Sequence, residues 1–364
     1  MVVCNITGDF IMTEKGKNKN AILVLIILVI LLAAIGLVEY GIICKNIEKN
    51  RQLSTLKKQV EEEAKDGVKE HGKLKVVGVQ LRDEKGNNVQ LRGMSSHGIL
   101  WYPDYINYAS IMETKKHGAN MFRIAMYSDG GGDGYIKKPE LSKRLMYQAV
   151  ENVLSADMYA IVDWHILNDG NPNTNIEKAK EFFKEITGAY KNNLGIIYEI
   201  CNEPNGDTTW DDIVKYADEI IPIIRNNAPD AIILVGTPDY SYSVTKVGKK
   251  LEYDNIMYSY HFYAGQYDDS YQYMIGDAQR AGVPVFVSEW GINTENNKET
   301  ALQHGKKFAE YINKENISFA AWSLCNKDEC FSAIKPECIK YSGWNDEDLT
   351  EVGKILFSAL NGDK

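Results

Sequence analysis

The chain has 364 residues, of which 44% are hydrophobic and 25% charged, with 29 Gly and 9 Pro. This composition excludes collagen-like, low-complexity and disordered chains, while the length fits either two domains or one large α/β barrel. The net charge of −9 argues against a nucleic acid as partner, because polyanion binding requires a surplus of cations. The acidity belongs to residues 72–364, which carry 31 basic and 41 acidic side chains.

An uncharged run of 18 residues, AILVLIILVILLAAIGLV, occupies positions 21–38. As a helix, this run is just long enough to cross the hydrocarbon core of a bilayer, which is about 30 Å thick. We therefore predict a transmembrane anchor over 21–43, preceded by an N-terminal tail of residues 1–20. The alternative is a cleaved signal sequence, whose apolar region is normally shorter, about 7–15 residues.

Residues 45–71 contain no Pro, and their apolar residues recur at spacings of three and four. The recurring residues are Leu53, Leu56, Val60, Ala64 and Val68. This amphipathic helix pattern predicts a helical stalk over 44–71, and a flexible charged linker is the alternative. Three lysines precede the apolar run and five cations follow it, a count that opposes an outside-facing body. Long domains often translocate regardless of that count.

Beyond residue 72, short β-rich runs alternate with longer amphipathic stretches. The runs predict strands at 90–96, 119–125, 158–164, 195–201, 231–236, 256–261, 284–289 and 318–323. Helical patterns lie between them at 140–155, 177–192, 210–226, 268–281 and 299–314. Most of the runs are apolar on both faces, as buried parallel strands are. This alternation predicts an α/β fold, a (β/α)8 TIM barrel over residues 72–364.

A short hairpin at 72–89, turned by Lys85-Gly86-Asn87, is expected before the barrel. A doubly wound open sheet is the alternative fold, but its first strand would be followed by a Gly-rich phosphate loop, and GMSSHG is not one. The six cysteines form no CxxC pair, so a zinc or thioredoxin-like site has no support. Cys330 and Cys338 are either a disulfide or two free thiols.

Polar and aromatic side chains crowd the C-terminal ends of the predicted strands, where barrel enzymes carry their chemistry. In chain order these side chains are His97, Trp101, Tyr102, Arg123, Tyr127, His165, Asn202, Glu203, Tyr240, His261, Tyr263, Glu289, Trp322, Lys327 and Glu329. Each residue alone has an ordinary structural explanation. Core packing does not explain why they coincide at all eight strand ends.

Glu203 and Glu289 stand at the ends of the fourth and seventh predicted strands, so they face one cavity from opposite sides. Paired carboxylates without a metal-ligand set or a nucleophilic Ser or Cys motif point to glycoside hydrolysis. Arg123 and the hydroxyl of Tyr263 are expected to stabilise Glu289 as an anion, and a second carboxylate nearby raises the pKa of Glu203. We therefore predict Glu203 as the acid/base and Glu289 as the nucleophile, about 5–5.5 Å apart as retaining enzymes require.

Flat apolar rings suit the C–H faces of pyranose sugars. We therefore expect five aromatic residues to stack on sugar rings, namely Trp101, Tyr102, Tyr127, Tyr240 and Trp322.

The runs LRGMSSHGILWY, MFRIAMY, IVDWHIL, YEICNEPNG, HFYAG, VFVSEWG and WSLCNKDE resemble glycoside hydrolase family 5. Within it, they are similar to bacterial endo-β-1,4-glucanases, or cellulases. The resemblance implies a (β/α)8 barrel and a retaining double displacement without cofactor or metal, with Glu203 as proton donor and Glu289 as nucleophile. It assigns His97, Arg123, His165, Asn202, His261, Tyr263 and Trp322 to the active-site shell. It assigns Trp101, Tyr102, Lys327, Asp328 and Glu329 to glucan binding.

The resulting hypothesis is a monomeric endo-β-1,4-glucanase acting on cellulose or a related β-glucan. The alternatives are a β-mannanase or xyloglucanase on the same barrel, and a catalytically silent glucan-binding surface protein. Tyr240 departs from the family pattern, since close relatives often carry Trp there. Because polymeric glucan does not enter the cytoplasm, we expect the barrel outside the cell, held to the cell membrane by residues 21–43 or secreted after signal cleavage.

Overall fold

The computed structural model describes residues 66–362 apart from 130 and 132, and also the isolated positions 27, 28, 36, 43 and 51. The predicted tail, nearly all of the anchor at 21–43 and most of the stalk lie outside the described residues. Among the residues that are described, no helix is both long and apolar enough to cross a membrane. The anchor and the stalk therefore stay predictions.

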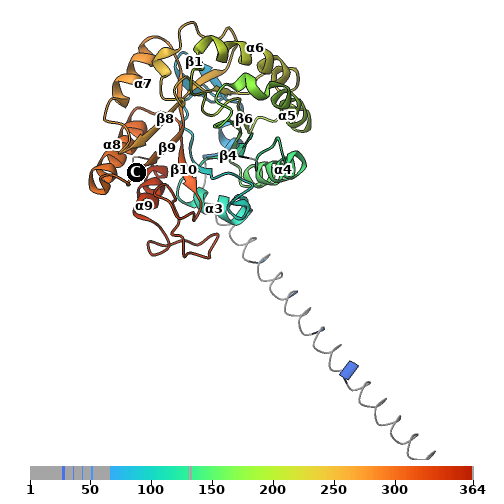
Figure 1. Cartoon of the computed structure of the whole chain (residues 1–364), viewed down its shortest axis with the longest axis vertical. Helices are drawn as coiled ribbons and strands as arrows, with labels where there is room; N and C mark the ends of the chain where they lie inside the picture. The colour runs from blue at the N-terminus through green and yellow to red at the C-terminus, as the bar shows by residue number, and fades with distance from the viewer. Residues whose placement is uncertain are drawn as a thin grey trace, which may run out of the picture. The chain divides into compact units, whose positions relative to one another are not determined.

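Eight parallel strands close into a barrel, which confirms the predicted fold (Figure 1). The strands are β3 (Arg92–Ser96), β4 (Met121–Tyr127), β5 (Tyr159–His165), β6 (Ile196–Glu199), β7 (Ile233–Val235), β8 (Ile256–Ala264), β9 (Val285–Ile292) and β10 (Phe319–Leu324). The closure pairs β10 with β3, with Phe319 opposite Arg92 and Ala321 opposite Met94. Every predicted run overlaps one of these strands.

Helices surround the barrel (Figure 1). They are α3 (Tyr108–Lys116), α4 (Pro139–Ser155), α5 (Ile176–Ala189), α6 (Trp210–Asn227), α7 (Tyr271–Arg280), α8 (Lys298–Lys314) and α9 (Glu351–Leu360). The predicted helices correspond to α4–α8, whereas α3 and α9 were not predicted. Short 3₁₀ turns lie at η1 (Pro103–Ile106), η3 (Pro172–Asn175) and η4 (Val244–Lys246), and η4 is the only helical turn on the connection from β7 to β8.

Helix α6 illustrates how the local sequence sets these elements. Thr209 caps its N-terminus, because its hydroxyl accepts a hydrogen bond from the backbone N–H of Asp212 while the Asp212 carboxylate accepts one from the N–H of Thr209. The buried residues of α6 recur at helical spacing, namely Ile213, Tyr216, Ala217, Ile220, Ile221 and Ile224. This apolar stripe packs inward and leaves the charged side chains outside.

The hairpin before the barrel exists, but its turn was predicted at the wrong residues. Strands β1 (Lys75–Val77) and β2 (Gln80–Arg82) pair antiparallel around a two-residue turn at 78–79. Gly78 takes a φ of +64° there, a conformation that glycine adopts without strain. Residues 85–87 form the next turn instead, and the Asp83 carboxylate accepts hydrogen bonds from the N–H groups of Lys85 and Asn87 at 2.9 and 2.8 Å.

Apolar side chains close the N-terminal end of the barrel. Met121, Ile161, Ile197, Leu234 and Phe286 from the strands form one buried cluster with Leu74, Leu81, Val89 and Leu91 from the hairpin region. The chain is attached to the same end by Asp66, whose carboxylate bonds Arg92 at 2.8 Å, His71 at 2.8 Å and Asn120 at 3.0 Å. The folded unit thus includes Asp66 and α2 (Val68–His71). The predicted site residues lie at the opposite end of the barrel.

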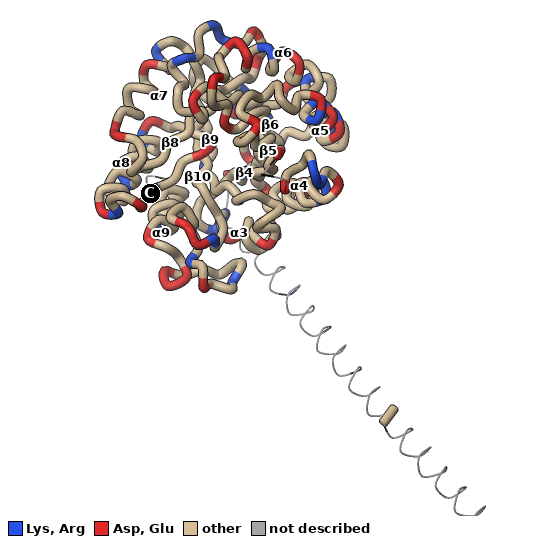
Figure 2. Tube along the Cα trace, viewed as in Figure 1, with Lys and Arg blue, Asp and Glu red and all other residues tan. Residues whose placement is uncertain are grey.

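Charged residues are interspersed over the outer helices, for example on α5 and α8 (Figure 2). Lysines and glutamates pair along α5, as Lys178 with Glu181 at 2.9 Å and Lys180 with Glu177 at 3.1 Å. Nucleic-acid-binding proteins instead gather their cations in one patch or stripe. The cations of α5 are therefore paired locally with acidic side chains.

Candidate active site

The C-terminal ends of the barrel strands bring together most of the predicted site residues. Strands β8 and β9 extend further than predicted, so His261 lies within β8 and Glu289 within β9. Strand β6 ends early at Glu199, so Asn202 and Glu203 lie on the loop that follows it. This arrangement places one carboxylate on a rigid strand and the other on a loop.

Arg123 on β4 is fully buried and organises the centre of the site. Its guanidinium bonds Glu199 through Nε at 2.6 Å, and Glu289 through one terminal nitrogen at 2.9 Å. The other terminal nitrogen donates to the Asn202 side-chain oxygen at 2.6 Å and contacts Asp163 at 3.0 Å. A planar fork with five N–H donors matches such a ring of oxygens, and a buried guanidinium requires it.

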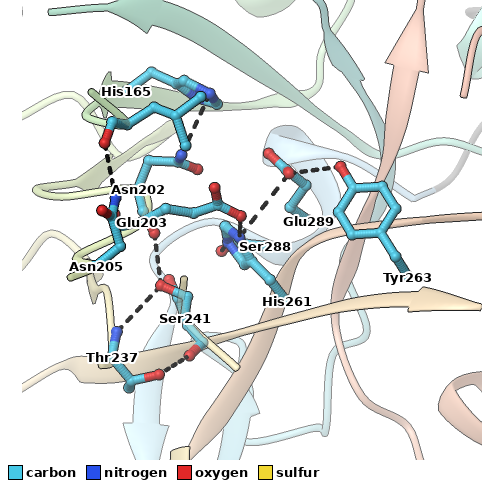
Figure 3. A network of polar contacts seen from close by, with 12 residues as sticks. His165, Asn202, Glu203, Asn205, Thr237, Ser241, His261, Tyr263, Ser288 and Glu289 are labelled. Carbon is cyan, nitrogen blue, oxygen red and sulfur yellow. Dashed lines mark hydrogen bonds and ion pairs between the residues drawn. The ribbon is translucent and has the colours of Figure 1, made fainter. Parts of the chain in front are cut away.

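Glu289 is held as an anion by two donors. Arg123 binds one carboxylate oxygen, and the hydroxyl of Tyr263 donates to the other at 2.7 Å. Burial disfavours the charge, but the positive charges of His261 and Arg123 outweigh it and lower the pKa of Glu289 below its ordinary value. Glu289 is therefore ionised at neutral pH and aimed from β9 into the cleft (Figure 3).

Glu203 has the opposite electrostatic environment. Its side chain is 13% exposed and bonds the ring Nδ1 of His261 at 2.9 Å. Burial, together with the negative charge of Glu289, raises the pKa of Glu203 above its ordinary value, in spite of the hydrogen bond from His261. The two environments thus favour the protonated form of Glu203 and the ionised form of Glu289.

His261 lies between the two glutamates. Burial disfavours the imidazolium, but the charge of Glu289 and the hydrogen bond to Glu203 outweigh it and raise the pKa of His261 to about 9. Its Nε2 contacts the Ser288 hydroxyl at 3.0 Å, so both ring nitrogens have partners (Figure 3). A protonated His261 donates from both nitrogens.

A buried chain of polar groups orients Asn202. The Nδ1 of His165 bonds the Asp163 carboxylate at 2.6 Å, and its Nε2 faces the Asn202 amide nitrogen at 3.3 Å. Burial lowers the pKa of His165 to about 3, so this ring is neutral. A neutral ring that donates to Asp163 leaves its Nε2 free to accept from Asn202, which fixes the direction of the amide.

Aromatic rings on β10, β4, β5 and the loop after β3 form one cluster at the C-terminal end of the barrel, which we call the aromatic half of the site. The ring of Tyr127 lies 4.1 Å from His165 and 4.6 Å from Trp101, measured between ring centroids. Trp322 contacts His97 and His165 at 5.3 and 5.4 Å. Trp101 is 38% exposed, so part of this residue is accessible to a ligand.

The polar residues after β10 edge the aromatic half. Lys327 and Glu329 form an ion pair at 2.6 Å, and the Glu329 carboxylate lies 3.7 Å from His97. Tyr102 packs its ring 4.9 Å from that of His97. Asp328 is exposed and lies outside this cluster of contacts. Cys330 and Cys338 are free thiols, which decides between the two alternatives left open by the sequence.

Residues from β6, β7 and β8 line the other half of the cleft, which we call the pocket half. An open cavity of about 230 Å³ is bordered there by Leu167, Glu203, Tyr240, His261, Tyr263, Gln266 and Tyr267. Tyr240 is 48% exposed at its edge. Gln266 and Tyr267 were not among the predicted site residues, because they lie beyond the end of β8 on a segment without a distinctive pattern.

Asp163 and Glu199 are functional groups that the sequence reasoning missed. Both lie inside apolar strands and are fully buried. The observation that singled out Arg123, a charge inside an apolar strand, applies equally to these two acids. Treating the three charges as one set would have revealed that Arg123 has partners besides Glu289.

Glu203, His261 and Glu289 each offer one ligand atom, and these atoms lie within 4.8 Å of one another. Carboxylate oxygens and imidazole nitrogens are suitable metal ligands, but imidazole binds a metal only in its neutral form. Because the pKa of His261 is about 9, its nitrogens carry protons at neutral pH. A metal ion at these atoms would therefore have to displace a proton of His261.

Comparison with known protein families matches residues 82–328 to the family model described as cellulase (glycosyl hydrolase family 5). The chain is 43% identical over 295 residues to an endoglucanase of Clostridium saccharobutylicum. It is 42% identical over 302 residues to endoglucanase A of Butyrivibrio fibrisolvens. These matches cover 80% and 81% of this chain, and 65% and 70% of the respective relatives.

The solved structures similar to this chain also include cellulases. The cellulase Cel5C_n is 34% identical with a TM-score of 0.76, covering 82% of this chain and 95% of that protein. The catalytic domain of Thermobifida fusca endoglucanase Cel5A is 33% identical with a TM-score of 0.75, covering 81% and 99%. A variant of that domain was solved in complex with cellotetraose.

Proposed function

The chain belongs to the cellulases of glycosyl hydrolase family 5, and we propose that it is a retaining endo-β-1,4-glucanase. The substrate is cellulose or a related β-glucan, cut at internal β-1,4-glucosidic bonds. The observation that carries the proposal is the pair of carboxyl groups with opposite pKa shifts, Glu203 raised and Glu289 lowered, facing one cleft. The similarity of the chain to endoglucanases of Clostridium saccharobutylicum and Butyrivibrio fibrisolvens supports the substrate class.

In the first step, Glu203 donates its proton to the glycosidic oxygen while a carboxylate oxygen of Glu289 attacks the anomeric carbon. The bond to the leaving sugar breaks, and a covalent glycosyl-enzyme forms on Glu289. In the second step, Glu203 removes a proton from water, and the resulting oxygen attacks the same carbon and releases Glu289. One water is consumed, and both carboxyl groups return to their initial state.

The distance between the carboxyl groups supports retention of configuration. Oxygens of Glu203 and Glu289 lie within 4.8 Å of each other. Retaining enzymes have carboxyl groups about 5–5.5 Å apart, whereas inverting enzymes leave about 6.5–9.5 Å for a water. The separation in this chain therefore fits the retaining class.

The stereochemistry of the first product tests this proposal. We expect proton NMR to show the β-anomer as the initial product of cello-oligosaccharide hydrolysis, with the α-anomer appearing only by later mutarotation. Initial α-anomer would contradict the double displacement. Parallel rates on carboxymethylcellulose, glucomannan and xyloglucan would test the glucan preference, and binding of all three without turnover would indicate a silent binding protein.

We expect a bell-shaped pH dependence of kcat/KM, because turnover requires Glu289 ionised and Glu203 protonated. Activity should fall as pH decreases through the lowered pKa of Glu289, and as pH increases through the raised pKa of Glu203. The acidic limb should therefore lie below the ordinary glutamate pKa and the alkaline limb above it. Rates between pH 3 and 10, with stability checked at each pH, would reveal a monotonic profile if these roles are wrong.

The location of the barrel outside the cell is part of the same proposal. It is supported by the apolar run at 21–38 and by the polymeric nature of the substrate. Intact cells should hydrolyse added carboxymethylcellulose. After lysis, the activity should be found in the membrane fraction. Activity confined to the cytosolic fraction would contradict this location, and activity confined to the medium would indicate signal cleavage.

A further inference from the structure

Three consecutive non-glycine residues after β7 adopt a left-handed backbone conformation. Asp239, Tyr240 and Ser241 have φ values of +57°, +60° and +58°. L-residues enter this region as single residues and rarely in runs, because Cβ crowds the following carbonyl oxygen. Such strain persists where the surroundings impose it, and it concentrates at functional sites. We call this segment the left-handed turn.

The left-handed turn is bonded to the loop that carries Glu203, on both sides of that residue. The Ser241 hydroxyl donates to the backbone carbonyl of Asn202 at 2.6 Å (Figure 3). The backbone N–H of Tyr240 donates to the carbonyl of Pro204 at 2.9 Å. Residues 200–205 belong to no helix or strand, and these two bonds add to the backbone bonds that the loop makes with Trp164, Gly170 and Leu234.

Ser241 also holds the hydrogen-bond partner of Glu203. Its carbonyl accepts from the backbone N–H of His261 at 2.9 Å, and its hydroxyl accepts from the N–H of Thr237 at 3.2 Å. Ser241 is fully buried. One side chain and its backbone thus tie together the acid/base loop, the start of the left-handed turn and the strand that carries His261.

The position of Glu203 indicates which part of the substrate binds in the pocket half. The aromatic half is built from β10, β4, β5 and the loop after β3, whereas Glu203 borders the pocket half with Tyr240 and Gln266. An acid that protonates the glycosidic oxygen must lie beside the leaving group. The leaving-group sugar therefore enters the pocket half, where the left-handed turn presents the half-exposed ring of Tyr240.

We propose that Ser241 is a positioning residue for the proton-donation step, because through the left-handed turn it holds the loop that carries Glu203. This proposal rests on the proposed function, since it uses Glu203 as the acid/base. Ser241 acts through Glu203 and touches no reacting atom. Its removal leaves Glu289 and Arg123 in place, so attack on the anomeric carbon persists while proton donation is impaired.

Aryl β-cellobiosides separate these two effects in the full-length chain. 2,4-Dinitrophenolate leaves without protonation, whereas phenolate requires it, and a positioned general acid contributes about 10²–10⁴-fold to such a step. For Ser241→Ala we expect kcat/KM on phenyl β-cellobioside to fall about 10- to 100-fold. On 2,4-dinitrophenyl β-cellobioside we expect it to stay within about threefold of the wild type.

Two further variants complete the design. Ser241→Gly removes the hydroxyl but allows a positive φ without strain, so it should show the same selective loss. Ser142→Ala is a matched control, because Ser142 is also buried and its hydroxyl bonds a backbone carbonyl, that of Lys138 at 2.9 Å, on the outer helix α4. It should leave both substrates unaffected. Thermal melts of each variant report folding.

The outcomes are distinct. Equal losses on both substrates would show a merely structural role and overturn the proposal, as would unchanged rates on both. If Ser241→Gly has wild-type kcat/KM on both substrates, the loss in Ser241→Ala is due to backbone strain. The proposed role of the hydroxyl is then overturned. A folded wild type that turns over neither cellobioside would overturn the proposed function itself, and this proposal with it.

Discussion

Replacing Glu289 with glutamine should lower kcat on carboxymethylcellulose by roughly 10⁴-fold or more, the order of loss when an enzyme is deprived of its nucleophile. A neutral amide cannot attack the anomeric carbon in place of the carboxylate. Glutamine keeps nearly the same shape, so oligosaccharide binding should persist. Reducing-sugar release measures the first effect, and calorimetric titration with cellotetraose measures the second.

The fold should survive this substitution because Arg123 keeps other partners. Its Nε bonds Glu199 at 2.6 Å, and it also contacts Asp163 at 3.0 Å. The guanidinium is therefore not left unpaired when the charge of Glu289 is removed. A cooperative melt close to that of the wild type is the expected result.

Glu113→Gln is a matched control for Glu289→Gln. Glu113 is a buried glutamate on α3 that pairs with Lys116 at 3.2 Å, away from the cleft. Its substitution should leave kcat within about twofold of the wild type, as expected for residues outside the site. Near-wild-type turnover by Glu289→Gln would contradict the assigned nucleophile.

A chemical rescue can distinguish the two carboxylates. In Glu289→Gly, azide can enter the vacated space and attack the anomeric carbon directly, giving an α-glycosyl azide by a single inversion. In Glu203→Gly, azide would instead attack the glycosyl-enzyme and give the β-azide. The configuration of the product therefore reports which residue is the nucleophile. Exchanged configurations would reverse the assignment of acid/base and nucleophile.

The strands of the barrel could be predicted because they are uniformly apolar and bounded by polar ends. Helix α9 was not predicted, although its exposed residues Glu351, Lys354 and Ser358 recur at helical spacing opposite a buried face. Helix α3 shows little contrast between its faces, since its buried residues include Ser110, Glu113 and Thr114. Helical periodicity is a signal of such contrast, so the pattern of α3 could not have been recognised from the sequence.

The paired glutamates could be predicted from their strand ends, but their electrostatic support could only be predicted in part. Arg123 and Tyr263 were expected beside Glu289, and the structure places both within hydrogen-bond distance. The contribution of His261 to Glu203 and Glu289 required its three-dimensional position. A sequence shows which charges are buried, but the sign of a pKa shift depends on distances between elements far apart in the chain.

The pocket half illustrates a different limit. Tyr240 was predicted from its position after β7, but its left-handed conformation has no signature, since Asp239, Tyr240 and Ser241 are ordinary residues. The hydrogen bonds that hold this conformation are donated by the left-handed turn and accepted by the backbone carbonyls of Asn202 and Pro204. Backbone conformations that are dictated by tertiary contacts escape any prediction from local residue type.

Arg123→Lys should reduce kcat by roughly 10²-fold or more, although the charge is conserved, because small misplacements of catalytic groups have effects of this size. A lysine ammonium is one point with three donors and cannot reach Glu199, Glu289 and Asn202 together, as the guanidinium does. Steady-state kinetics on cello-oligosaccharides should show the loss in kcat, with a smaller change in KM.

The same substitution should also change stability and the pH profile. Buried acceptors left without a donor should cost about 1–3 kcal/mol of unfolding free energy, measurable by urea denaturation. Because Arg123 lowers the pKa of Glu289, weaker pairing should move the acidic limb of kcat/KM to higher pH. A structural defect alone would lower the stability without moving that limb.

Arg92→Lys is the matched control for Arg123→Lys. Arg92 is also paired with a carboxylate, that of Asp66 at 2.8 Å, but at the closed end of the barrel. Its substitution should affect stability alone and leave kcat and the acidic limb unchanged. If Arg123→Lys instead keeps its kcat and its acidic limb, the low pKa of Glu289 must depend on His261 and Tyr263. The guanidinium would then hold the barrel together without tuning the nucleophile.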